Sequence, residues 1–205
     1  MVNYVTLQLV LVADENFASY GQIVILDGLS MQTKILLTSF KTWLPHQKSN
    51  SSDDLLAEIQ KLNYDSISLF FLRSLSVDIQ IASQQVIAEV ERIQPNVVMC
   101  CGMAEKRERL AIESNAWHKN ECLYSTVNLS DLNQKLNVTE ISHDAGKFVC
   151  EGLYYELLKY LQVESKSIDC IFVHVPKLEG SNVNSILNDI SSMFAWFEAK
   201  SKQKP

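Results

Sequence analysis

Short, continuous apolar runs recur along the chain, and they limit its fold more than any other feature of the sequence. Few of them alternate with polar residues, so they are typical of strands that are covered on both faces of a sheet. Amphipathic patterns typical of helices fill several of the intervals between them. We expect strands over 34–40, 66–72, 96–101, 122–127, 138–142 and 168–174.

The helical patterns have identifiable ends. The segment Ser52–Asp54 supplies a cap and first-turn acids for one helix. A second pattern covers 79–94 and stops at Pro95, because proline cannot continue a helix. Further helices are expected directly after Cys150 and over 183–199.

Strands that alternate with helices predict an α/β fold. We expect a single-domain, three-layer α/β/α sandwich around a twisted, mostly parallel sheet. The runs 122–127 and 138–142 have no helical pattern between them, so the sheet is expected to be mixed. A chain of 205 residues fits one such domain.

Composition and charge exclude several classes of function. The formal net charge is -6, and the Lys and Arg residues form no cluster, so a general binder of nucleic acid is not expected. No basic amphipathic stretch predicts binding to a membrane surface. Met1–Ala13 is too short to span a bilayer and lacks the basic start of a signal peptide. We therefore expect a cytoplasmic protein.

The cysteines point to reduced thiols. Their number is odd, two are adjacent and no CxxC pair occurs, so neither a disulfide framework nor a zinc site is predicted. We expect no metal and no cofactor. The five residues are Cys100, Cys101, Cys122, Cys150 and Cys170.

A nucleophile is predicted where the segment 142–150 (SHDAGKFVC) runs directly into a helix. A thiol at a helix N-terminus faces unpaired N–H groups, which stabilise a thiolate. A helix over 151–162 carries the chain roughly 18 Å away from Cys150, and the strand over 168–174 brings it back by about 20 Å. Cys150 and His174 should therefore meet at one edge of the sheet, as a thiol and its base must.

Other candidates are expected at the same edge. Glu113 falls in the loop after strand 96–101, while Phe40 and Trp43 lie at and after the end of strand 34–40. Each residue also has a plain structural interpretation. A cysteine is often a small core residue, a histidine in an apolar strand is often a hydrogen-bonded core group, and Arg107 and Arg109 can be solvated charges.

Four segments resemble motifs of the pyroglutamyl peptidase I family, also called pyrrolidone-carboxylate peptidases. SHDAGKFVC resembles the nucleophile motif S-x-x-A-G-x-[FY]-V-C-N, and IFVHVP is similar to F-[IV]-H-[IV]-P. CGMAEKRERLAIESNA resembles G-Q-A-G-G-R followed by E-R-x-A-x-N, with Arg107 and Glu113 at the Arg and Glu. LLTSFKTWLPHQKSNSS resembles L-x-T-G-F-x-P-F-G-G with N-P-S after it. The order and spacing agree over about 34–199.

The resemblance implies an α/β/α sandwich and a cysteine peptidase that removes an N-terminal pyroglutamyl residue. It implies that Cys150 attacks the acyl carbon, that His174 moves the proton, and that Glu113 orients the imidazole. It places Phe40, Trp43, Met103 and Arg107 in substrate binding. The implied partners are small peptides with a blocked N-terminus, and a homo-oligomer is left open.

The sequence also departs from the family at its substrate pocket. Met103 stands in place of the family's Gln, Trp43 replaces one ring of the aromatic pair, and Glu105 and Lys106 replace two glycines. The sequence leaves two alternative functions open. One is a catalytically altered relative that binds peptide termini or a protein partner in the old cleft. The other is an enzyme like the nucleoside phosphorylases, which needs a phosphate site that the sequence lacks.

Residues 1–30 have no counterpart in this resemblance. We expect an extension without a clear role over 1–30, the peptidase-like domain over 31–200, and a disordered tail over 201–205. The extension is either an added edge strand over 4–10 or upstream sequence ahead of a later start, and we favour the second. A chain that begins at Met31 should then melt within about 4 °C of the full chain.

Overall fold

The computed structural model describes residues 32–203. The predictions for residues 1–30 lie outside this range. Within it, the last helix continues to Ser201, one residue into the segment expected to be a tail.

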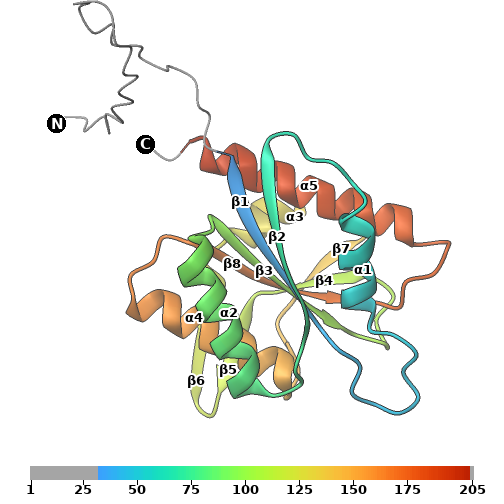
Figure 1. Cartoon of the computed structure of the whole chain (residues 1–205), viewed down its shortest axis with the longest axis horizontal. Coiled ribbons are helices and arrows are strands. Elements are labelled where there is room, and N and C mark those ends of the chain that lie inside the picture. The colour runs from blue at the N-terminus through green and yellow to red at the C-terminus, as the bar shows by residue number, and fades with distance from the viewer. Residues whose placement is uncertain (1–31, 204–205) are drawn as a thin grey trace, which may run out of the picture. The chain divides into compact units, whose positions relative to one another are not determined.

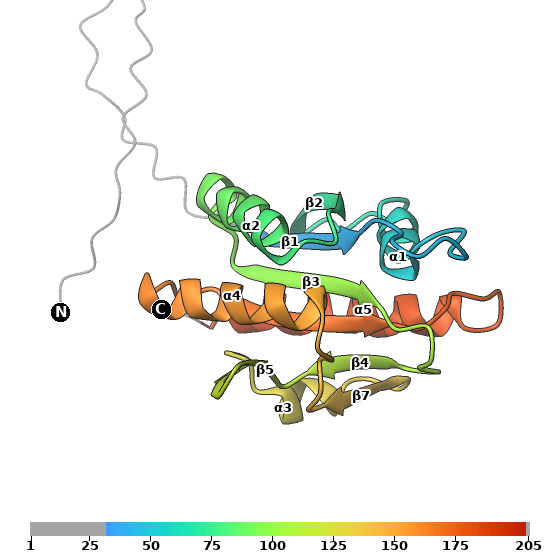
Figure 2. The same ribbon diagram turned by 90° about the horizontal axis from the view of Figure 1, so that it is seen from below.

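A six-stranded mixed sheet forms the centre of the fold, with the strand order β2-β1-β3-β8-β4-β7 (Figure 2). The first four strands of that order run parallel, whereas β4 is antiparallel to β8 and β7 is parallel to β4. The predicted fold class, a mostly parallel but mixed sheet, is confirmed. The strands are β1 (Thr33–Phe40), β2 (Ile67–Leu75), β3 (Val97–Met103), β4 (Leu110–Glu113), β7 (Thr139–Ser142) and β8 (Asp169–Val175).

Helices cover both faces of the sheet and complete the three layers (Figure 1). The apolar faces of α1, α3 and α5 pack on one side, and those of α2 and α4 pack on the other. Both faces of the central strands are thereby buried, which explains why their sequences are apolar without alternation. The helices are α1 (Ser51–Ile59), α2 (Ile79–Ile93), α3 (Leu129–Asn133), α4 (Val149–Val163) and α5 (Val183–Ser201).

The run expected as a strand over 122–127 has a different place. β6 (Glu121–Tyr124) pairs with β5 (Asn115–His118) in a separate two-stranded ribbon. The short helix α3 then lies between this ribbon and β7. The sheet is therefore mixed for another reason than the one expected, namely the reversed direction of β4 and of β7, which is parallel to it.

The starts of two helices position the site. Asn50, and not Ser52, caps α1, because its side chain accepts a hydrogen bond from Ser52 N at 3.0 Å. α4 begins at Val149 after Phe148, and no side chain caps it. Its first N–H groups therefore lack the side-chain acceptor that most helices have.

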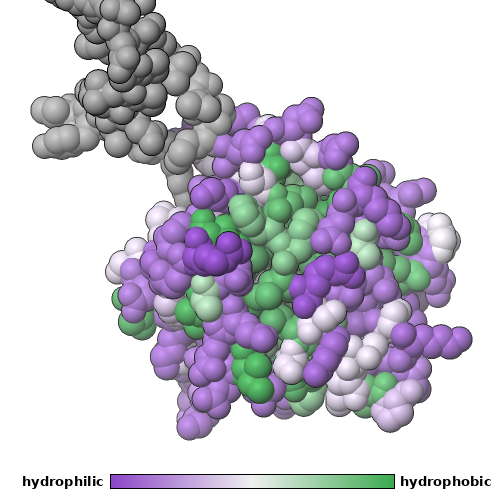
Figure 3. Space-filling model, in the orientation of Figure 1, coloured by the Kyte–Doolittle hydropathy of each residue, from purple (hydrophilic) through white to green (hydrophobic). Residues whose placement is uncertain are grey.

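Apolar side chains reach the surface at one edge of the sheet. Figure 3 shows them as a band through the middle of the face on which β2 lies. Leu69, Phe70, Phe71 and Leu72 of β2 are all only partly buried. None of the helices between residues 32 and 203 combines the length and the apolar character needed to cross a bilayer.

Candidate active site

Cys150 lies in the first turn of α4 with its thiol against the end of β3. A Cβ atom placed on Gly102 would lie 2.7 Å from Cys150 Sγ and 2.9 Å from Phe172 Cζ. Gly102 therefore makes room for the thiol by having no side chain. Because Gly102 is the register partner of His174 in the next strand, the thiol sits beside the strand position that carries the histidine.

His174 forms a buried hydrogen bond with Glu113. The distance between His174 Nδ1 and Glu113 Oε1 is 2.7 Å, and Glu113 is 0% exposed. Glu113 does not lie in a loop, as expected, but is the last residue of β4. In the antiparallel pairing Ala111 is opposite His174 and Glu113 is opposite Phe172, so Glu113 reaches the imidazole diagonally on one face of the sheet.

Arg107 contacts this pair from the side of Glu113. Its Nη2 donates to Glu113 Oε1 at 3.3 Å and to Ser142 Oγ at 2.9 Å. Its Nη1 donates to Glu140 Oε1 at 3.2 Å. Residues of β4 and β7 thus hold the guanidinium, whose charge opposes that of the buried carboxylate.

Burial governs the acidity of Cys150. Desolvation, with the negative charge of Glu113 as the next cause, raises the pKa of the Cys150 thiol to about 12. We expected the helix start to stabilise a thiolate, but burial outweighs that effect here. Ionisation at neutral pH therefore requires a nearby proton acceptor, and the imidazole of His174 lies on the same cavity.

A cavity of about 220 Å³ opens onto the thiol and the imidazole. Three of the four residues expected to bind substrate contribute to its wall: Phe40, Trp43 and Met103. Arg107 is not part of that wall. The complete lining is Phe40, Trp43, Asn50, Val77, Met103, Ala145, Phe148, Val149, Cys150 and His174.

Phe148 is the lining residue that sequence reasoning missed most clearly. Its ring lies 4.7 Å from that of Trp43, at an interplanar angle of 35°. The sequence does contain a sign of this role, because Phe148 stands at the aromatic position of the nucleophile segment, two residues before Cys150. Trp43 and Phe148 thus form an aromatic pair in the wall of the cavity.

The polar side chains of the lining are already engaged. Asn50 Oδ1 accepts from Ser52 N and from Ser52 Oγ, and Asn50 Nδ2 donates to Lys41 O. Met103 Sδ accepts from Ser51 N at 3.4 Å. Apart from Cys150 and His174, the described walls therefore offer a ligand mainly apolar surface and backbone groups.

Within residues 32–203, no group of three or more His, Cys, Asp or Glu side chains is arranged to hold a metal ion.

No family model matches the chain. Curated proteins named pyrrolidone-carboxylate peptidase do match it. The protein from Brevibacillus brevis is 25% identical over 155 residues, which cover 63% of this chain and 72% of the relative. The protein from Vibrio vulnificus is 28% identical over 171 residues, covering 71% and 79%. The chain is a divergent relative of the pyrrolidone-carboxylate peptidases.

Solved structures of these peptidases share the fold. Pyroglutamyl peptidase I from Bacillus amyloliquefaciens aligns with a TM-score of 0.72 at 16% identity, covering 82% of this chain and 96% of that one. The pyrrolidone carboxyl peptidase from Thermococcus litoralis aligns with a TM-score of 0.69 at 16% identity and the same coverage. At this identity the structural likeness establishes the fold alone.

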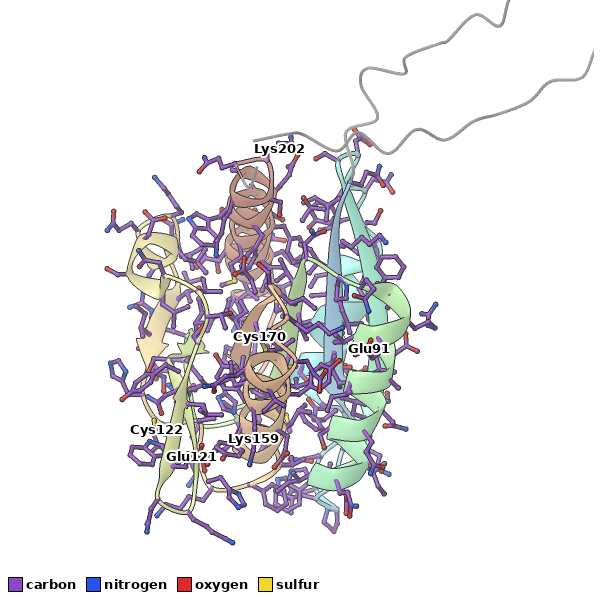
Figure 4. The ribbon with its side chains drawn as sticks, turned by 90° about the vertical axis from the view of Figure 1, so that its left-hand side faces the viewer. Glu91, Glu121, Cys122, Lys159, Cys170 and Lys202 are labelled. Atoms are coloured by element: carbon purple, nitrogen blue, oxygen red, sulfur yellow. The ribbon has the colours of Figure 1, made fainter. Side chains whose placement is uncertain are left out.

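The other four thiols are not part of the cavity lining. Cys100, Cys101 and Cys170 are fully buried. Figure 4 shows Cys170 inside the molecule, behind α4, and Cys122 on the outer ribbon. Cys122 is partly exposed. Cys150 is thus distinguished by its place on a cavity beside a histidine.

Proposed function

We propose that the protein is a cysteine peptidase that removes an N-terminal pyroglutamyl or similarly blocked residue from peptides. The observation that carries the proposal is the arrangement around one cavity. Cys150 and His174 both line it, and the far nitrogen of the imidazole is fixed by the buried carboxylate of Glu113. A nucleophile, a base and a group that orients the base are the parts that acyl transfer needs.

The first step forms a tetrahedral intermediate on the way to a thioester. His174 Nε2 accepts the proton of the Cys150 thiol while Sγ bonds to the carbonyl carbon of the blocked residue. The carbonyl electrons move to oxygen, which the first N–H groups of α4 stabilise. The missing side-chain cap at Phe148 supports this role, because no side chain competes for those donors.

The second step breaks the amide and restores the enzyme. The tetrahedral intermediate collapses, the C–N bond breaks, and the imidazolium of His174 protonates the departing amine. Water then attacks the thioester with His174 as base, the C–S bond breaks, and the thiol takes back its proton. Glu113 stabilises the imidazolium in both halves of the reaction.

Arg107 is proposed to position the carboxylate. Its contacts with Glu113, Ser142 and Glu140 support this role better than direct binding of substrate. The guanidinium holds the Glu113 carboxylate in place against His174 Nδ1, so that Nε2 is the nitrogen left to face the thiol.

The lining of the cavity supports a neutral, blocked terminus as substrate. No Asp or Glu is among the lining residues, so a free N-terminal ammonium group would enter without a counter-charge. The rings of Phe40, Trp43 and Phe148 instead suit a flat, uncharged group.

The test is release of a fluorophore from a pyroglutamyl amide. The wild-type protein should hydrolyse it, and Cys150→Ala should abolish hydrolysis because the nucleophile is lost. Cys122→Ala, which alters the partly exposed thiol of β6, should retain wild-type activity. Hydrolysis that survives in Cys150→Ala would rule out the proposed nucleophile.

A second candidate is a binding protein for blocked peptide termini. The side chains of Asn50 and Met103 favour this function, because both already accept hydrogen bonds within the protein. Few side-chain groups are then left to hydrogen-bond a lactam. A thermal shift with pyroglutamyl peptides, in the absence of any turnover of a panel of blocked amides, would support this function over the peptidase.

A further inference from the structure

Tyr154 lies one helical turn after Cys150 on α4, so the two side chains share one face of that helix. Its side chain is fully buried and is not part of the cavity lining. None of the proposed steps of the reaction uses it. A buried phenol is expected to keep a hydrogen-bond partner for its hydroxyl, and the partner of Tyr154 leads to the active site.

The hydroxyl of Tyr154 connects α4 to the strand that carries the carboxylate. Tyr154 Oη donates to Glu113 O at 3.3 Å, and a second carbonyl, Cys170 O, lies at 3.5 Å. Cys170 O also accepts from Ser125 Oγ at 3.1 Å, so it has a donor without Tyr154. Burial raises the pKa of the Tyr154 phenol well above its ordinary value, so the hydroxyl keeps its proton and remains a donor.

The place of Glu113 in the chain gives this contact its effect. Glu113 is the last residue of the four-residue strand β4. From the side of β7 the end of this strand is held by Ser114 N, which donates to Ser142 O at 2.8 Å. From the side of α4 it is held by the hydroxyl of Tyr154. The Glu113 carboxylate in turn contacts His174 Nδ1 at 2.7 Å, so a movement of the strand end would also move the imidazole.

The ring of Tyr154 packs in the same region. Its centroid lies 5.8 Å from that of Phe172, whose own centroid lies 5.0 Å from that of His174. Tyr154 and Phe172 both belong to the apolar cluster beneath α2 and α4. A phenylalanine at position 154 would keep this packing, so the hydroxyl can be removed alone.

We propose that Tyr154 is a positioning residue, whose hydroxyl holds Glu113, and through it the imidazole of His174, at a fixed place relative to the helix that carries Cys150. The inference rests on the proposed peptidase function, because it names a further residue for the same reaction. A small displacement of the imidazole from the thiol is enough to slow proton transfer between them.

The first test removes the hydroxyl and keeps the ring. Tyr154→Phe should lower kcat on a pyroglutamyl amide roughly five- to tenfold, the effect of one lost hydrogen bond, and change KM by less than about twofold. Tyr155→Phe is the matched control and should keep the wild-type kcat. Tyr155 is the next residue of α4, and its buried ring carries a hydroxyl that donates to Glu121 of β6, on the outer ribbon (Figure 4).

The second test does not depend on peptidase turnover. Tyr154→Phe should slow the alkylation of Cys150 by iodoacetamide at pH 7.5 by roughly three- to tenfold and move its onset to higher pH. The reason is that a displaced carboxylate stabilises the imidazolium of His174 less, so the imidazole accepts the thiol proton less readily. Tyr155→Phe should give the wild-type pH profile.

The two tests separate failure of this role from failure of the peptidase proposal. A protein that hydrolyses no blocked amide, but whose alkylation profile shifts in Tyr154→Phe, would contradict the peptidase proposal and keep the positioning role. An unchanged alkylation profile in Tyr154→Phe, or an equal shift in Tyr155→Phe, overturns the positioning role. A merely structural tyrosine would lower the Tm without moving that profile.

Discussion

The thiol of Cys150 experiences two opposing effects at the scale of one residue. The helix start favours a thiolate, whereas burial and Glu113 raise its pKa to about 12. With that pKa, the thiol alone would be almost entirely protonated at pH 7.5. Reactivity at neutral pH therefore has to come from proton transfer to His174.

We expect iodoacetamide at pH 7.5 to alkylate Cys150 before the other thiols and to abolish activity. His174→Ala should slow this alkylation at least about tenfold and move its onset to higher pH. The reason is that the Cys150 thiol, whose pKa is raised, then has no imidazole beside it to accept its proton. Peptide mass spectrometry measures both effects. His46→Ala serves as control, and labelling of Cys122 while Cys150 stays inert would contradict the assignment.

Met103 is predicted to weaken recognition of a lactam. Its thioether already accepts from Ser51 N, and it offers no N–H to a ring carbonyl. Met103→Gln should raise kcat/KM on pyroglutamyl amides by roughly fivefold, the value of a hydrogen bond of about 1 kcal/mol. Met103→Leu should bring no such gain. A wild-type protein that is already efficient, and weakened by Met103→Gln, would show that specificity lies elsewhere.

At the scale of elements, the local patterns around Cys150 and His174 could be predicted. α4 starts two residues before the expected place, and β8 covers nearly the expected range. β4 could not be predicted. It has four residues, LAIE, bounded by charged and polar neighbours, and its strand character comes from pairing with β7 and β8. The position of Glu113 was therefore expected in a loop.

The end of β3 must lack a side chain at Gly102. Gly102→Ala would bring a methyl group within 2.7 Å of Cys150 Sγ, and Phe172, which is fully buried, cannot yield on the other side. We expect a loss of roughly 1–3 kcal/mol in the free energy of unfolding. We also expect kcat to fall by a larger factor than that by which KM changes. Urea unfolding and steady-state kinetics measure the two.

Gly180→Ala is the matched control for that substitution, because a Cβ atom there meets nothing within 4 Å. It should leave both stability and kcat near the wild-type values. Unchanged kcat in Gly102→Ala would mean that the thiol reacts from another position than the one described.

Across the whole molecule, the cavity lining shows what a single sequence does not reveal. Val77, Asn50 and Ala145 come from separate loops and helix starts, and only the completed fold brings them beside Cys150. A neighbouring groove, to which Lys48, Met103 and Lys177 contribute, also arises from segments far apart in sequence. Periodicity predicts which segments are buried, but it carries no information on which loops meet.

Asp189 joins the last helix to the far part of the sheet. Its carboxylate is fully buried and accepts from Asn137 N at 2.9 Å and Val138 N at 2.8 Å. It also accepts from Thr139 Oγ1 at 2.6 Å, at the start of β7. β7 carries Ser142, which holds Arg107, so α5 supports the site through this edge strand.

Asp189→Ala would leave two partly buried backbone N–H groups and the buried hydroxyl of Thr139 without this acceptor. We expect this change to cost roughly 2–4 kcal/mol and to lower the Tm by roughly 5–15 °C. Asp189→Asn should cost less, because its amide oxygen can still accept part of the network. Glu108→Ala, which removes an exposed carboxylate, should leave the Tm unchanged. Differential scanning calorimetry measures all three, and an Asp189→Ala protein as stable as the wild type would show that α5 holds the sheet through its apolar face alone.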